Sequence, residues 1–205
     1  MTRLARWILP LLGLGGGEVA AQDDTKVEIG PRLLMVTAGG VPTNDMAGYG
    51  VFGSYRWKPR WRLGFALDWV GGDFEVPNEV VQISTPEVVD STVESLVVSA
   101  WVERTYGRWF WTAGLGFAAP DVDDLSGPTA GGGTFDLTTD AGSETIVSGT
   151  GGLRWSWGRR LSAEIALRVD HHLAGWTVRD RVSGRTGTIG SYTAYGVHAG
   201  LGWRF

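Results

Sequence analysis

The sequence has 205 residues, of which 43% are apolar and 20% charged, with 32 glycines, 11 tryptophans and no cysteine. This length is that of one domain, and the net charge of −4 argues against a nucleic-acid-binding surface. The lack of cysteine excludes disulfide bridges, cysteine-type zinc sites and catalysis by a thiol.

The beginning of the chain has the features of a secretory signal peptide. Two arginines precede a short apolar run over residues 7–14, and Val19-Ala20-Ala21 has the small-x-small pattern that a signal peptidase cuts. The run is too short for a membrane-anchoring helix, which needs roughly 20 apolar residues. We therefore expect residues 1–21 to be removed and residues 22–205 to form one exported domain.

From Val27 onward, apolar residues alternate with small or polar ones in blocks about ten residues long, the repeat of a transmembrane β-strand. The last block is the clearest, because from Tyr195 to Phe205 its odd-numbered positions are all apolar and its even-numbered positions are glycine, histidine or arginine. The eight blocks cover residues 28–38, 48–57, 61–70, 93–104, 109–118, 145–157, 161–170 and 192–205.

Many tryptophans occupy the apolar faces of these blocks beside short connections or at the C-terminus. They are Trp57, Trp61, Trp109, Trp111, Trp155, Trp157 and Trp203. A soluble β-sandwich would crowd these indoles at one end of its core, whereas a membrane barrel places them in an interfacial belt. The opposite belt would consist of Tyr49, Trp69, Phe117 and Tyr195. We therefore predict an all-β fold, an eight-stranded antiparallel up-and-down transmembrane β-barrel, with the sandwich as the alternative.

The connections between blocks alternate in length. Those at residues 58–60, 105–108 and 158–160 are tight, and those at 71–92, 119–144 and 171–191 are long. Outer-membrane barrels make tight turns in the periplasm and carry longer loops outside the cell. This alternation predicts that both chain ends lie in the periplasm.

Two glycine-rich motifs carry a resemblance to a known family. They are Ala-Gly-Leu-Gly-Phe at 113–117 and Ala-Gly-Leu-Gly-Trp-Arg-Phe at 199–205. The mature chain resembles the small outer-membrane barrels of the OmpA, OmpX and OmpW type. The resemblance implies a place in the cell outer membrane among lipids and lipopolysaccharide, and recognition of the strand ending in Phe205 by the outer-membrane assembly machinery. It implies no single activity, because activities differ widely among these barrels.

Charged side chains on the inward faces would be costly if they were alone in a narrow lumen, so we expect them to pair. Counting back from the turn at 158–160 places Arg154 opposite Glu164, which predicts a salt bridge. The same count across 58–60 places Arg56 opposite Arg62, an unfavourable like-charged pair.

The carboxylate expected to intervene between these two arginines is Glu103 on the neighbouring strand. Arg204, with Glu28 or Arg32, is expected in the same periplasmic layer. Because eight-stranded interiors are just wide enough for side chains to fill, we predict a lumen plugged by paired charges. A gated channel that uses these residues as its gate is the alternative.

The cluster Asp170-His171-His172 is the one group that suggests chemistry. By alternation its first and third side chains point inward and the second points outward. A lipid A deacylase such as PagL has a serine nucleophile two residues after a strand-end histidine, but here that position holds Leu173 or Ala174. Ser183 or Ser191 would have to substitute from the loop. Neighbouring histidines on a strand leave opposite faces, so we expect no metal site.

The long outer loops differ in charge. The loop after residue 118 carries Asp121, Asp123, Asp124, Asp136, Asp140 and Glu144. These residues do not fit a calcium-binding loop, so we expect a solvated acidic loop at the cell surface. The last loop carries Arg179, Arg181 and Arg185, whose guanidinium groups are candidates for contact with lipopolysaccharide phosphates.

We therefore expect a non-enzymatic outer-membrane protein with a structural or surface-interaction role, without cofactor, metal or nucleic-acid partner. A small channel or carrier for apolar molecules, as in OmpW, is one alternative, and bilayer conductance separates it from a plugged barrel. A lipid A-modifying acyl hydrolase is another.

Overall fold

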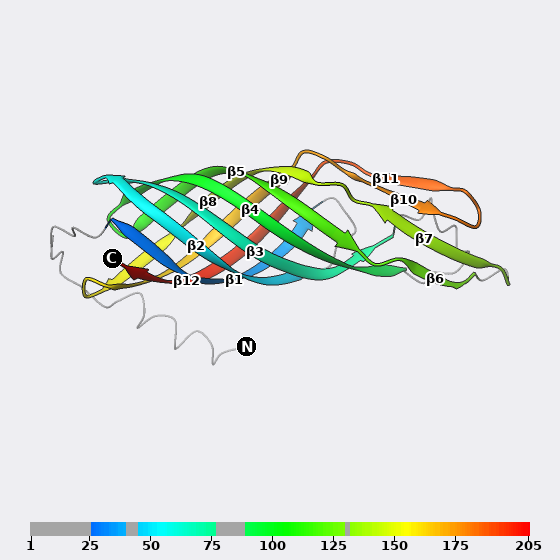
Figure 1. Ribbon diagram of the computed structural model, residues 1–205, viewed down its shortest axis with the longest axis horizontal. Coiled ribbons are helices and arrows are strands. Elements are labelled where there is room, and N and C mark those ends of the chain that lie inside the picture. Colours follow the sequence, from blue (N-terminus) through cyan, green and yellow to red (C-terminus); the bar gives the residue numbers. More distant parts are fainter. Residues whose placement is uncertain (1–25, 40–44, 77–88, 130–131) are drawn as a thin grey trace, which may run out of the picture.

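The computed structural model describes residues 26–39, 45–76, 89–129 and 132–205, so the expected signal peptide lies outside the described residues. Eight long strands of these segments form one closed antiparallel barrel (Figure 1). The barrel strands are β1 (Val27–Gly39), β2 (Met46–Lys58), β3 (Trp61–Glu75), β4 (Asp90–Tyr106), β5 (Trp109–Val122), β8 (Glu144–Trp157), β9 (Leu161–His172) and β12 (Tyr192–Arg204).

Each barrel strand pairs with the next barrel strand along the chain, and β12 closes the barrel by pairing with β1. The eight-stranded up-and-down barrel predicted from the alternation is therefore confirmed. The described residues contain no helix with the length and apolarity needed to cross a membrane.

Several strands continue beyond their predicted ends. The β3–β4 ladder runs on to the pair Glu75 and Asp90, and β5 continues to Val122. These extensions contain acidic residues and lack the apolar stripe that marks the barrel strands, so the alternation alone does not reveal them.

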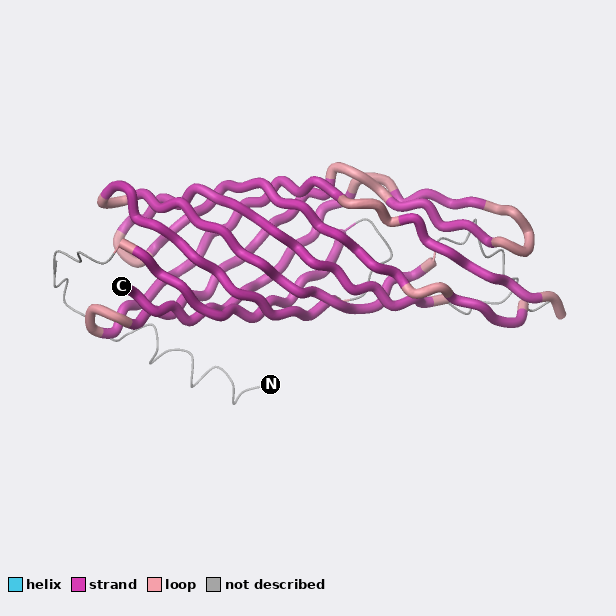
Figure 2. The backbone as a smooth tube through the Cα atoms, viewed as in Figure 1, coloured by secondary structure: helices cyan, strands magenta, loops and turns pink. Residues whose placement is uncertain are grey.

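Four short strands form a second sheet beyond one end of the barrel (Figures 1 and 2). They are β6 (Leu125–Pro128), β7 (Thr134–Asp140), β10 (Trp176–Asp180) and β11 (Thr186–Ile189), in the order β11-β10-β7-β6. The long outer connections predicted from the sequence therefore contain strands of their own. The pairing of β7 with β10 joins two long connections into one structure, which we call the outer sheet.

The opposite end of the barrel carries the tight turns and the C-terminus. Gly107 and Gly158 adopt φ angles of 61° in two of these turns, a conformation that glycine adopts without steric cost. The Lys26 N–H donates to the Phe205 carbonyl (3.0 Å), so the two ends of the described barrel meet there. We call this the periplasmic end, following the usual turn asymmetry of outer-membrane barrels.

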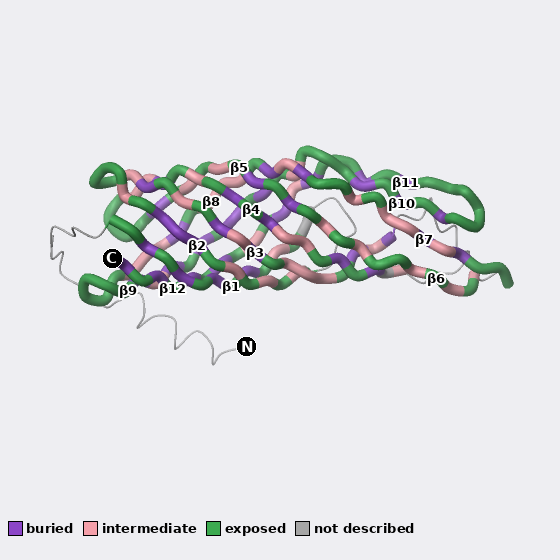
Figure 3. The backbone as a smooth tube through the Cα atoms, in the orientation of Figure 1, coloured by how far each residue is buried: buried purple, intermediate pink, exposed green. Residues whose placement is uncertain are grey.

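Buried and exposed residues alternate along the barrel strands (Figure 3), and the exposed ones are the bulky apolar residues, the inverse of a soluble protein. On β9 the outward Leu167 is 68% exposed, whereas the inward Arg168 and Asp170 are 7% and 6% exposed. Both expected aromatic belts lie on the outer surface, and from Tyr195 to Trp203 the chain climbs ~26 Å along the strand. With a strand tilt of about 40°, this corresponds to roughly 20 Å of bilayer. The bulky faces therefore contact hydrocarbon, and the sandwich alternative is excluded.

Candidate functional site

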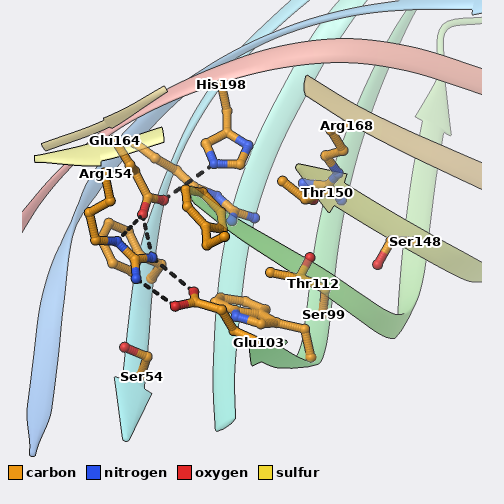
Figure 4. A pocket seen from close by; sticks show the side chains of 14 residues that line it. Ser54, Ser99, Glu103, Thr112, Ser148, Thr150, Arg154, Glu164, Arg168 and His198 are labelled. Atoms are coloured by element: carbon orange, nitrogen blue, oxygen red, sulfur yellow. Dashed lines mark hydrogen bonds and ion pairs between the residues drawn. The ribbon is translucent and has the colours of Figure 1, made fainter. Parts of the chain in front are cut away.

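The lower part of the lumen is filled by ion pairs that join strands across the barrel. Arg154 on β8 donates to both oxygens of Glu103 on β4 (2.5 and 2.8 Å) and to Glu164 Oε2 on β9 (2.6 Å from Nη2; Figure 4). His198 Nε2 lies 3.3 Å from Glu164 Oε1. Arg154 and Glu164 are direct partners in the β8–β9 register, where the count across the turn places them.

A second cluster completes this layer nearer the periplasmic end. Glu28 on β1 bonds to Arg62, accepts from Arg204 Nε (3.1 Å) and accepts from the Ser162 hydroxyl (2.5 Å). Arg62 Nε is also 3.8 Å from Glu103 Oε1, which connects the two clusters. The sequence predicts either Glu28 or Arg32 in the same layer as Arg204, and the structure places Glu28 beside it.

Carboxylates and arginines are paired within this lower layer. Three buried carboxylates face three arginines, and these residues are Glu28, Glu103 and Glu164 with Arg62, Arg154 and Arg204. Arg56 is half-buried and lies opposite Arg62 in the β2–β3 register, next to a bulge. Matched charges with bidentate hydrogen bonds are the arrangement that offsets desolvation in a narrow interior.

A middle layer was not assigned from the sequence. Arg32 Nε donates to Asp68 Oδ1 (2.6 Å), and Arg168 Nη1 donates to Asp68 Oδ2 (3.1 Å). Arg168 Nε also lies 2.6 Å from Asp170 Oδ2, so two arginines face two aspartates. Alternation identifies each of these residues as inward, but their pairing crosses from β1 and β9 to β3. A register count between neighbouring strands does not predict such contacts.

A large inward side chain lies opposite a glycine on the neighbouring strand. Trp101 on β4 points into the lumen opposite Gly64 on β3, and Arg32 Cζ lies 5.7 Å from the indole centroid. A Cβ atom at Gly64 would lie 2.4 Å from Trp101 Cε2. Glycine is therefore required for the indole to fit inside the barrel.

The outer end of the lumen is covered by the outer sheet. Trp176 on β10 donates its indole N–H to Glu144, and the other Glu144 oxygen bonds to His172 Nδ1. The His172 ring stacks on Tyr192, with centroids 4.2 Å apart, and Trp176 packs edge-on against Phe74 at 5.6 Å. We call this group the outer cap.

In the outer cap, the position of Glu144 differs from the prediction and the orientation of the two histidines agrees with it. Glu144 was expected in a solvated loop, but it is only 1% exposed because Trp176 and His172 enclose its carboxylate. His172 points inward and His171 points outward, where its Nδ1 lies 3.0 Å from Thr193 Oγ1, as the alternation predicts.

Little empty space remains between these layers. One cavity of about 30 Å³ lies beside Arg154, and another of about 50 Å³ lies below the outer cap. Each has room for only a few water molecules. The upper cavity is mostly apolar, and its walls include Leu34, Val36, Val70, Val97 and Ile146.

The arginines of the last loop have different surroundings. Arg181 pairs with Asp124 (2.8 Å) and Asp136 (3.3 Å), whereas Arg179 and Arg185 are exposed. The loop therefore supplies partners for acids that were expected to be only solvated.

The proposed loop nucleophile has a structural partner instead. Ser183 donates its hydroxyl to Asp180 (2.5 Å) in the turn after β10. Within the described ranges, no three or more histidine, aspartate or glutamate side chains are grouped to hold a metal ion.

Comparisons with known proteins support the fold. No protein-family model and no curated protein sequence matches the chain. Among solved structures, Neisserial surface protein A has a TM-score of 0.50 and 12% identity, over 87% of this chain and 97% of that chain. Ail, the attachment invasion locus protein of Yersinia pestis, gives 0.48 and 13%, over 88% and 97%. Outer membrane protein AlkL gives 0.47 and 11%, over 93% and 94%.

The chain is thus an eight-stranded β-barrel of the small outer-membrane type. A closed barrel leaves no strand edge unpaired in hydrocarbon, and the apolar band between two aromatic belts matches a bilayer. The location that follows from this architecture is the outer membrane.

Proposed function

We propose that this protein is a non-enzymatic outer-membrane barrel with a structural or surface-interaction role and a lumen closed to ions. The carrying observation is the pair of layers of ion pairs that cross the lumen, one centred on Arg154 and one on Asp68. The outer cap adds a third closure at the other end. A column of ion-paired side chains across the lumen leaves no continuous water path for a hydrated ion.

Planar-bilayer conductance tests this closure. We expect no stable discrete openings from the wild-type protein. A variant with Glu103, Arg154 and Glu164 all replaced by alanine removes three of the six charged side chains of the lower layer and serves as the comparison. Stable openings of the wild-type protein at moderate voltage would contradict the proposal.

The surface role centres on the outer sheet. Its exposed side includes Thr177, Arg179 and Thr188, while its other side packs on the barrel rim. Because Arg181 is already paired, we narrow the proposed lipopolysaccharide contact to Arg179 and Arg185. The double variant R179Q/R185Q should bind lipopolysaccharide more weakly than wild type, and R159Q at the periplasmic end should not. Equal binding by all three would contradict this contact.

The apolar cavity below the outer cap favours a second candidate, a carrier of small apolar molecules. At about 50 Å³ it is too small for such a molecule with the cap in place, so transport requires the outer sheet to move. Saturable binding of an apolar fluorescent probe inside the wild-type barrel would favour the carrier over the closed structural barrel.

The non-enzymatic assignment has its own test. Glu144 orients His172 much as an acid orients the imidazole of acyl hydrolases, and Ser95 lines the same cavity as His172. We expect lipid A incubated with the folded protein to keep its acylation pattern by mass spectrometry. Altered acylation that H172A or S95A abolishes would overturn the assignment.

A further inference from the structure

Arg104 is a cation on the lipid-facing side of the barrel. It follows the inward Glu103 on β4, so its own side chain points outward among the periplasmic aromatic belt. Its direct neighbours on the flanking strands are both tryptophans, Trp61 on β3 and Trp111 on β5. A guanidinium group therefore sits in a row of indoles at the level of the lipid headgroups.

Aromatic rings hold this guanidinium group in place. Its Cζ lies 5.1 Å from the Trp61 ring centroid and 4.9 Å from that of Tyr106. Trp61 in turn packs edge-on against Trp111, with centroids 6.2 Å apart. Because Tyr106 is two residues closer to the turn, the contact directs the Arg104 side chain towards the periplasmic water, as long cationic side chains do at membrane surfaces.

The protein leaves part of this group unsatisfied. Arg104 Nε is covered, yet no acceptor among the described residues bonds to it, and none of their carboxylates pairs with the side chain. A covered donor without an acceptor is costly, and stacking on aromatic rings supplies no hydrogen-bond acceptor lone pair. The terminal Nη1 and Nη2 atoms are not covered and bond to no described residue, so their acceptors come from the surroundings, and phosphodiester oxygens are the anionic acceptors at this depth of a bilayer.

The surface beside the aromatic row accommodates an acyl chain. Gly151 is the outward partner of Trp111 across the β5–β8 ladder, and the next outward pair towards the membrane centre is Ala113 with Gly149. A Cβ atom at Gly151 would meet no other atom within 4 Å. These small residues form a stripe without protruding side chains on the lipid-facing surface, next to the headgroup level on the side of the membrane centre.

We propose that Arg104, with Trp61 and Tyr106, binds the phosphodiester of a glycerophospholipid in the periplasmic leaflet, with an acyl chain along the stripe of Ala113, Gly149 and Gly151. The guanidinium fork matches two phosphate oxygens, and the rings hold its plane before the lipid arrives. The site lies on the outer surface, so it is independent of whether the lumen conducts.

Native mass spectrometry of the folded barrel in detergent tests this site. Phosphatidylglycerol is titrated against diacylglycerol with the same acyl chains, which lacks the phosphate. We expect retained phosphatidylglycerol adducts on the wild-type protein and few diacylglycerol adducts. R104Q should bind phosphatidylglycerol roughly tenfold more weakly, the loss typical of a charge-assisted contact.

R159Q is the matched control, because Arg159 is an exposed arginine in a periplasmic turn and should bind phosphatidylglycerol as wild type does. R104K keeps the charge and loses the planar fork, so its affinity should fall several-fold, and it serves as the test if R104Q does not fold. Heat-modifiable gel migration verifies the folding of each variant. The proposal would be overturned if R104K and R104Q both bound phosphatidylglycerol with wild-type affinity. It would also be overturned if R104Q and R159Q lost equal affinity, because the binding would then reflect general attraction between the positive charges of the barrel and the lipid. Equal binding of diacylglycerol would overturn it as well.

Discussion

The two halves of the lumen are filled by different kinds of contact. The periplasmic half is filled by ion pairs between residues of the barrel strands, with three carboxylates facing three arginines. The outer half is filled mainly by apolar packing, and its central residue, Trp176, belongs to the separate outer sheet. The first set of contacts is made within the barrel wall, whereas the second depends on two long connections remaining paired.

The largest effect is expected from the periplasmic half. Replacing Arg154 with alanine leaves Glu103 and Glu164 buried together without their shared partner. Breaking a buried pair in this way costs about 3–5 kcal/mol, so R154A should lower the free energy of unfolding by about 4 kcal/mol. Equilibrium urea unfolding in lipid vesicles, followed by gel mobility, measures this change.

A compensated variant separates the charge effect from lost packing. The double variant R154M/E103Q keeps the volume and removes one charge of each sign, so Glu28 and Glu164 still face Arg62 and Arg204, and it should recover a large part of the stability that R154A loses. If the double variant were as unstable as R154A, the closure would depend on shape and not on charge.

In the outer half, truncation of Trp176 should have a smaller and local effect. W176A loses the packing against Phe74 and Tyr192 and the hydrogen bond to Glu144. Burial of a tryptophan is worth about 3 kcal/mol, which here stabilises the outer sheet on the barrel. We expect faster protease cleavage between β9 and β12 with unchanged heat-modifiable migration. Loss of the folded barrel itself would show that the two closures are not independent.

A third change tests how tightly the lumen is packed. G64A places a methyl group 2.4 Å from Trp101 Cε2, and overpacking of this kind costs about 1–3 kcal/mol. G151A is the matched control, since the same methyl group on the outer surface meets no atom within 4 Å. Vesicle unfolding should show a loss for G64A alone. Equal stability of the two variants would mean that the indole has room to move.

The two halves also differ in how far the sequence predicts them. A strand period of two and a three-residue turn fix which residues are opposite, so the register of Arg154 with Glu164 follows from counting. The contacts of Asp68 with Arg32 and Arg168 depend on how the barrel closes, because strands that are not neighbours meet across the lumen. Sequence spacing carries no such information.

The outer cap is less predictable still. Pairing of β7 with β10 joins segments about forty residues apart, and strands of four to seven residues are too short for a clear periodic pattern. One signal was available, namely that Trp176 and Val178 alternate with Thr177 and Arg179 inside a mostly polar connection. That signal indicates a strand but not its partner, so the enclosure of Glu144 could not be foreseen.

The smallest expected effect concerns the pH dependence of the outer sheet. Asp180 accepts hydrogen bonds from the Asp136, Val182 and Ser183 N–H groups and from the Ser183 hydroxyl, and these bonds hold the pKa of its carboxyl at about 2, below the ordinary 3.8. Because folding lowers the pKa of the Asp180 carboxyl, its stabilisation of the outer sheet is complete above pH 3.8 and is lost as the pH falls through 2. The local opening free energy of residues 176–189, obtained from hydrogen exchange corrected for the intrinsic exchange rate at each pH, should therefore fall by about 1 kcal/mol between pH 5 and pH 2. D180N should show this lower opening free energy already at pH 5 and little further change on acidification. If D180N kept the pH dependence of wild type, the titrating group would be another residue. The stability of the outer sheet would then not depend on the turn at Asp180.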